Sequence, residues 1–121
     1  MNSAYNVADI TVAQVDRAFP LASAADAAAD LGDWRQFCER IIAARDEGGA
    51  REHLLVCENG LGYLKGLCLA TLRDTDEGAV MDVPLHVVAT VLDEDGVRSA
   101  LRVRLQGLAA SAGGARLQLP A

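Results

Sequence analysis

The spacing of apolar residues changes twice along this 121-residue chain, and the change limits the folds that it can adopt. Between residues 11 and 46, apolar side chains recur every three or four positions, which is the period of an amphipathic helix. Between residues 52 and 92 they form nearly continuous runs separated by turn residues, which is typical of buried strands. The helical period returns from Gly96 to Ser111. The sequence therefore predicts an α/β (α+β) domain with a mixed β-sheet flanked by helices.

The first half of the chain predicts one short strand and two helices. The strand spans residues 5–10, and a capping box formed by Thr11 and Gln14 opens a helix over 11–22, whose last turn Pro20 disturbs. A second helix begins at the N-cap Asp33 and stops at residues 47–49, where two glycines follow an acid.

The second half predicts three consecutive strands, a helix and a final short strand. Strands over 52–60 and 63–74 are joined by an Asn59–Gly60 turn, and the third strand, 79–92, contains Pro84, which indicates a bulge or an edge. The helix over 96–111 carries one apolar stripe, and a strand over 115–120 ends the chain. The predicted order is β-α-α-β-β-β-α-β.

Length and charge exclude several classes of protein. A chain of 121 residues suits a single domain over 1–121, and its net charge of −6 argues against binding nucleic acids or acidic membranes. No apolar run reaches the roughly 20 residues that span a bilayer, and the N-terminus lacks the features of a signal peptide. The three cysteines lie far apart in apolar patterns without metal-ligand spacing, so we expect buried free thiols in a reducing cytoplasm and no metal site.

Two segments carry a resemblance to a known family: "LLVCENG…LKGLCLATL" and "VPLHVVATVLDEDGVRSALRVRLQGLAASAGGARLQL". Over the range from Ile10 to Leu119, the order of the predicted strands, helices and turns resembles that of the GNAT (acyl-CoA N-acyltransferase) superfamily. The resemblance implies that a splayed fourth strand binds the pantetheine arm of acetyl-CoA through its backbone, and that the turn before the main helix cradles the pyrophosphate. The implied cofactor-binding residues are Val88, Ala89, Thr90, Gly96, Val97 and Arg98.

The phosphate-binding turn departs from the family pattern. The family has Gln/Arg-x-x-Gly-x-Gly/Ala, whereas this chain has Asp93, Gly96 and Arg98 at the three defined positions, so that only the first glycine matches. Electrostatic repulsion between a pyrophosphate and each nearby carboxylate weakens binding by about 1 to a few kcal/mol. An ion pair between Arg98 and the phosphate would offset part of that loss. The acids at 93–95 equally suit a helix cap that needs no ligand. We therefore describe the motif as degenerate.

The chain also lacks the C-terminal helix and last strands that the family usually has. The outer edge of the final strand would then be exposed, and natural proteins rarely leave such an edge open. We expect a homodimer or another protein partner to cover this C-terminal sheet edge.

His86 and Asp82 are the candidate catalytic residues. The pKa of histidine lies near neutrality, and Asp82, four residues earlier on the same strand, is expected to point to the same face. Together they can activate an amine through water. The alternative is a packed strand histidine beside a solvent-facing acid.

Two functions follow from these observations. The favoured one is a degenerate, non-catalytic GNAT-like domain, without a cofactor, that acts as a dimeric protein-interaction or regulatory module. The alternative is an acetyl-CoA-dependent N-acetyltransferase whose cleft is completed by a second subunit.

Overall fold

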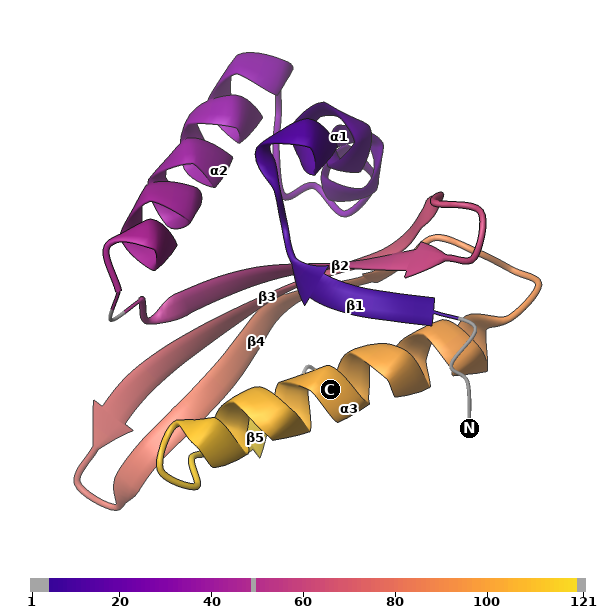
Figure 1. The fold of residues 1–121 in the computed structure, drawn as a ribbon. Helices are drawn as coiled ribbons and strands as arrows, with labels where there is room; N and C mark the ends of the chain where they lie inside the picture. The colour runs from indigo at the N-terminus through magenta and orange to yellow at the C-terminus, as the bar shows by residue number, and fades with distance from the viewer. Residues whose placement is uncertain (1–4, 49, 120–121) are drawn as a thin grey trace.

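A computed structural model describes residues 5–48 and 50–119 of the chain (Figure 1). Its elements are β1 (Tyr5–Asp9), the 3₁₀ turn η1 (Val12–Gln14), α1 (Val15–Ala24), α2 (Leu31–Asp46), β2 (Glu52–Asn59), β3 (Leu64–Thr75), β4 (Gly78–Val88), α3 (Glu94–Ser111) and β5 (Arg116–Gln118). Apart from the short 3₁₀ turn, this is the order that the sequence predicts. No helix in these described residues is both long and apolar enough to cross a bilayer.

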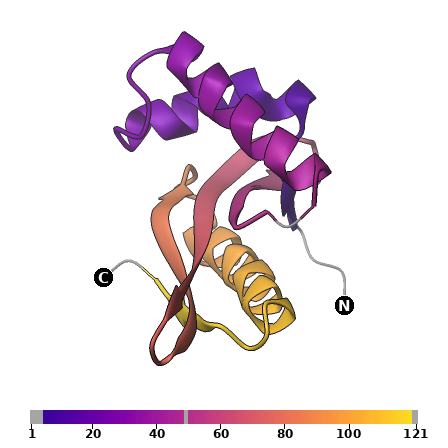
Figure 2. The same cartoon turned by 90° about the vertical axis from the view of Figure 1, so that its left-hand side faces the viewer.

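The five strands form one mixed sheet in the order β1-β2-β3-β4-β5. The first four are antiparallel to their neighbours, and β5 runs parallel to β4. Helices α1 and α2 cover one face and α3 covers the other, as the two perpendicular views show (Figures 1 and 2). The mixed sheet flanked by helices is therefore confirmed.

Each face of the sheet has its own apolar core. Trp34 of α2 is buried against the α1–α2 face, and its indole N–H donates to the carbonyl oxygen of Val15 at 2.7 Å. On the other face, the predicted stripe of α3 buries Val97, Leu101 and Leu105 completely. Burying a side chain of this kind stabilises the fold by about 1.5–3 kcal/mol, so the stripe holds α3 firmly on the sheet.

Gly66 of β3 sets how closely α3 approaches the sheet. A Cβ at this position would lie 2.9 Å from Val97 Cγ1 and 3.1 Å from Leu101 Cδ1. A larger residue would therefore lift the N-terminal half of α3 away from β3.

Several boundaries differ from the predictions for local reasons. Asp30, not Asp33, is the N-cap of α2, and its carboxylate accepts from the backbone N–H of Asp33 at 2.8 Å. Aspartate is a suitable N-cap at either position. The alanine-rich segment before Asp30 has little apolar periodicity, so the sequence contains no signal that the helix begins there. Pro20 is accommodated inside α1, which continues to Ala24. The Asn59–Gly60 turn is a longer loop, because the Asn59 side chain accepts from two backbone N–H groups beyond it.

Candidate functional site

Strand β4 contains a bulge at Pro84, which is one of the two features that this residue indicates. Leu85 pairs with Leu69 of β3 and Asp82 pairs with Thr71, so that Val83 and Pro84 together lie opposite the single residue between them. Proline has no N–H to donate to the ladder, which makes this position suitable for a bulge. The extra residue reverses the alternation of side chains along the rest of β4.

This reversal places Asp82 and His86 on opposite faces of the sheet. Met81 belongs to the core under α3, so Asp82 beside it points toward the α1–α2 side, where it forms an ion pair with Arg73. His86 lies opposite Cys68, which faces α3. The prediction that the two residues share a face is wrong, because strict alternation does not continue through a bulge.

His86 is half-buried beneath α3, without Asp82 as a partner. Burial lowers the pKa of His86, and the nearby positive charges of Arg98 and Arg102 lower it further. The imidazole is therefore neutral at pH 7. A neutral imidazole can accept a proton, but the same surroundings weaken it as a base.

The outer edge of β4 is open beyond the bulge. Strand β5 pairs with β4 only from Val80 to Asp82, so within the described part of the chain no strand pairs with that edge from Val83 to Val88. The Ala89 N–H is bonded to the carbonyl oxygen of Lys65 at 2.8 Å, on the β3 side. Because hydrogen-bonding direction alternates along a strand, the polar backbone groups of Val88 face the open edge.

The N-terminus of α3, where the resemblance places a pyrophosphate, is occupied by the chain's own carboxylate. Asp93 is the N-cap, and its Oδ1 accepts from the Gly96 N–H at 3.2 Å. The carbonyl oxygen of Asp93 accepts from the Val97 N–H at 3.2 Å. Two of the backbone donors that the resemblance assigns to phosphate are thus already used. Of the three acids expected to cap the helix, Asp93 is the cap, and Glu94 and Asp95 lie in the first turn of α3.

Tyr5 holds this cap from the far end of the sequence. Its phenol donates to Asp93 Oδ2 at 2.7 Å, and this hydrogen bond is the main reason that the pKa of Tyr5 is raised. The two residues are 88 positions apart, and no sequence pattern links them. Sequence reasoning therefore missed Tyr5.

Gly96 suits the cap as well as it would suit a phosphate. A Cβ at this position would lie 2.3 Å from Asp93 Oδ2, so any larger residue would push the carboxylate away. The glycine that matches the family motif thus has a structural reason within this chain alone.

Arg98 turns toward the acids of its own helix. Its guanidinium nitrogens lie 3.7 Å from carboxylate oxygens of both Glu94 and Asp95. All three side chains are exposed, so these pairs add little stability. They nevertheless direct the positive charge of Arg98 to internal partners.

The three cysteines all lie in the apolar cores of the fold. Cys38, Cys57 and Cys68 are buried and free, and burial raises their pKa values to about 12, about 11 and about 12. They are therefore protonated and unreactive at neutral pH. No cluster of metal-ligating side chains occurs in the part of the chain that the structure describes.

The described architecture is that of known acetyltransferases. A GNAT family acetyltransferase from Staphylococcus aureus aligns with a TM-score of 0.78 at 10% identity, over 98% of this chain and 87% of its own. An aminoglycoside 6'-N-acetyltransferase from Acinetobacter baumannii gives 0.79 at 14% identity, over 97% and 79%. A predicted acetyltransferase with acetyl-CoA from Clostridium acetobutylicum gives 0.70 at 9% identity, over 97% and 80%.

The chain therefore has the fold of the GNAT superfamily, as the resemblance implied. No protein-family model and no curated protein matches its sequence.

Proposed function

We propose that this chain is a GNAT-fold domain that does not use acetyl-CoA and acts as a non-catalytic protein-interaction or regulatory module in the cytoplasm. The observation that carries the proposal is the carboxylate of Asp93 at the N-terminus of α3, bonded to the Gly96 N–H and to the Tyr5 hydroxyl.

Phosphate binding would have to break this arrangement. Losing an N-cap costs about 1 kcal/mol, and each further hydrogen bond contributes about 0.5–1.5 kcal/mol. The incoming diphosphate would also lie beside Glu94 and Asp95, at a cost of about 1 to a few kcal/mol for each close pair. Arg98 offers limited compensation, because it already lies near both of those acids.

The sheet edge beside β5 supports a role in assembly. The described β5 has three residues and leaves most of the β4 edge unpaired. Such an edge accepts an added strand from another chain. We propose that a second copy or another protein covers it.

The second candidate is an acetyl-CoA-dependent N-acetyltransferase. The open backbone of β4 favours it, since the pantetheine arm could bond to Val88 at that edge and to Thr90 just beyond the strand. Of the three implied residues, Ala89 would contribute less, because its N–H is already bonded to Lys65. Gly96, Val97 and Arg98 would then hold the phosphates after Asp93 moves aside, and His86 would be the base without Asp82. Two of the solved structures compared above are acetyltransferases, and the third is a predicted acetyltransferase with acetyl-CoA.

Calorimetric titration of acetyl-CoA and CoA into the purified protein at low salt decides between the two candidates, with the mass in solution recorded alongside. We expect no binding up to about millimolar ligand. Binding in the micromolar range would contradict the proposal and favour the acetyltransferase. Arg98→Glu should then abolish that binding, because no other cation of the turn would remain for the phosphates.

A further inference from the structure

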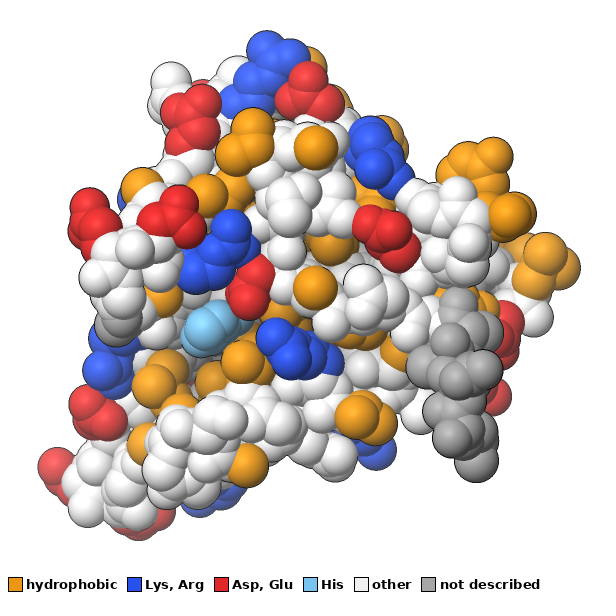
Figure 3. Space-filling view, viewed as in Figure 1, with side chains coloured by type: hydrophobic (Ala, Val, Ile, Leu, Met, Phe, Trp, Pro, Cys, Tyr) orange, Lys and Arg blue, Asp and Glu red, His pale blue; other side chains and the backbone are white. Residues whose placement is uncertain are grey.

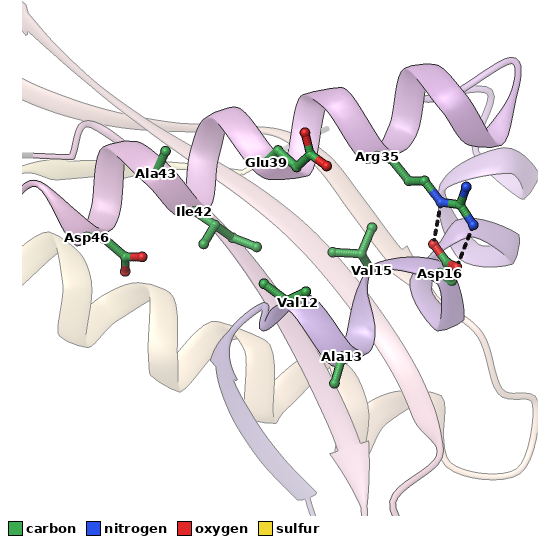
Figure 4. Close-up of a pocket in the computed structure, with 9 residues that line it drawn as sticks. All are labelled: Val12, Ala13, Val15, Asp16, Arg35, Glu39, Ile42, Ala43 and Asp46. Atoms are coloured by element: carbon green, nitrogen blue, oxygen red, sulfur yellow. Dashed lines mark hydrogen bonds and ion pairs between the residues drawn. The ribbon is translucent and has the colours of Figure 1, made fainter.

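A groove runs between η1–α1 and α2 on the face away from α3. Its volume is about 530 Å³, and Figure 4 shows the side chains that line it: Val12, Ala13, Val15, Asp16, Arg35, Glu39, Ile42, Ala43 and Asp46. The apolar side chains of Val12, Val15 and Ile42 point toward one another along its floor. Of these three, Val12 is 76% exposed, whereas Val15 and Ile42 are 7% and 9% exposed, so Val12 is the main apolar surface that the groove offers.

Acidic side chains border this apolar floor. The lining has three acids and one arginine, so its net charge is −2. Arg35 and Asp16 neutralise each other through two hydrogen bonds of 2.9 and 2.8 Å at one end of the groove. Glu39 and Asp46 remain along the α2 wall, seven positions apart and therefore on the same face of the helix, about 10 Å from each other.

The other arginines of α2 turn away from the groove. Arg40 donates to Glu52 at 2.9 Å, and Arg45 donates to the carbonyl oxygen of Ile10 at 2.7 Å. Asp46 lies 4.0 Å from Arg45, at the outer limit of an ion pair. Among the described residues Glu39 takes part in no ion pair within 4.0 Å. The charge of Glu39 is thus available to an external cation, and that of Asp46 is only weakly paired.

We propose that this groove binds an amphipathic helix of a partner protein, with an apolar stripe flanked by Lys or Arg. The inference rests on the proposed function and gives the interaction module its docking surface. A helix packed between two others is a common arrangement, and a basic amphipathic helix would set its apolar residues on Val12 and Ile42. The wall from Arg35 to Asp46 is about 16 Å long, which is enough for three helical turns.

A second copy of the chain fits the groove less well than a foreign helix. In a second copy, the helix face with the required chemistry, an exposed apolar residue next to arginine, is on α3. There Val103 is 66% exposed and Arg102 lies beside it. That face lies on the opposite side of the sheet from the groove (Figure 1). A contact between the two would be head-to-tail and would extend into chains of molecules unless it closed into a ring.

The test is an NMR titration of the ¹⁵N-labelled protein with a synthetic helical peptide of about three turns, bearing two leucines one turn apart and arginines on either side. We expect saturable shifts of the Ala13 and Ala43 amide signals with a Kd in the micromolar range. The charge reversal Glu39→Lys with Asp46→Lys should weaken binding by about tenfold or more. Asp76→Lys with Glu77→Lys, an equal charge change in the β3–β4 turn, should leave it close to the wild type.

Three outcomes would overturn the proposal: no shifts with about millimolar peptide, shifts centred outside the groove, or equal weakening by both double variants. Concentration-dependent groove shifts without peptide, accompanied by a rise in mass, would assign the groove to a second copy instead. Failure of the proposed function would be recognised separately, because it requires acetyl-CoA to bind in the calorimeter, whatever the peptide does.

Discussion

Two acidic regions of this molecule differ in what their carboxylates contact. At the N-terminus of α3, Asp93 is held by Gly96 and Tyr5, and the two acids after it lie near Arg98. In the groove beside α2, Glu39 has no ion pair within 4.0 Å among the described residues, Asp46 is only at the limit of one with Arg45, and the exposed Val12 lies beside them (Figure 4). Acids with internal partners stabilise a fold, whereas acids without them are available to a ligand.

At the top of Figure 3, over α1 and α2, hydrophobic side chains are exposed among acidic and basic ones.

The largest expected effect comes from moving α3 itself. Gly66→Ala places a methyl group 2.9 Å from Val97 Cγ1, and such overpacking lowers the free energy of unfolding by about 1–3 kcal/mol. Urea unfolding measures the change. Gly107→Ala on α3 is the matched control, since nothing lies within 4 Å of its Cβ position, and it should stabilise the helix by up to about 1 kcal/mol. Equal effects of the two variants would show that α3 does not approach β3 as described.

Removing one carboxylate from each region tests the comparison directly. Asp93→Ala loses the N-cap and the Tyr5 bond, so we expect the free energy of unfolding to fall by about 1–2 kcal/mol. Glu39→Ala should change it by no more than about 0.5 kcal/mol, because this exposed side chain has no close internal partner. Both values come from the same urea titrations. A larger loss for Glu39→Ala than for Asp93→Ala would reverse the assignment of the two regions.

Restoring the family motif should sharpen the contrast at α3. The double change Asp93→Gln with Arg98→Gly recreates the Gln-x-x-Gly-x-Gly pattern and frees the Gly96 N–H. It removes one acid and one arginine, so the net charge of the turn stays the same and any gain in affinity comes from the freed backbone donor. We expect CoA affinity to rise by about tenfold or more over the wild type in a calorimetric titration. Arg98→Gly alone serves as the control, because it changes the same helix position while the Asp93 cap remains in place; it should not raise the affinity. Unchanged CoA affinity in the double variant would mean that the self-cap is not what keeps phosphate out.

Sequence patterns predicted the fold well, because most of its elements are encoded locally. The stripe of Val97, Leu101 and Leu105 predicted α3 and its buried face, and Pro84 predicted the bulge. The sequence did not predict that the bulge would place Asp82 and His86 on opposite faces. That outcome depends on how many residues the bulge adds to β4, which is set by the pairing of β4 with β3. Pairing between distant segments was equally inaccessible: Tyr5 meets Asp93 only because β1 packs against α3. The groove required the relative placement of η1 and α2, which no periodicity specifies.

The smallest effect is a shift in tyrosine titration. The hydrogen bond to Asp93 raises the pKa of Tyr5 above its usual value of 10.0, so its contribution to stability is complete below pH 10 and is lost as the pH rises through the raised pKa. Asp93→Asn should move the titration of this phenol, followed by tyrosinate absorbance in the near ultraviolet, toward lower pH. Tyr5→Phe identifies which of the two tyrosines moves. The corresponding substitution Glu39→Gln should leave the titration unchanged, because Glu39 lies on α2, on the opposite side of the sheet from the α3 cap (Figure 1). A shift of equal size with Glu39→Gln would indicate that the overall charge of the protein, and not the hydrogen bond to Asp93, raises the pKa of Tyr5. The bond between Tyr5 and Asp93 could then no longer explain the stability of the α3 cap.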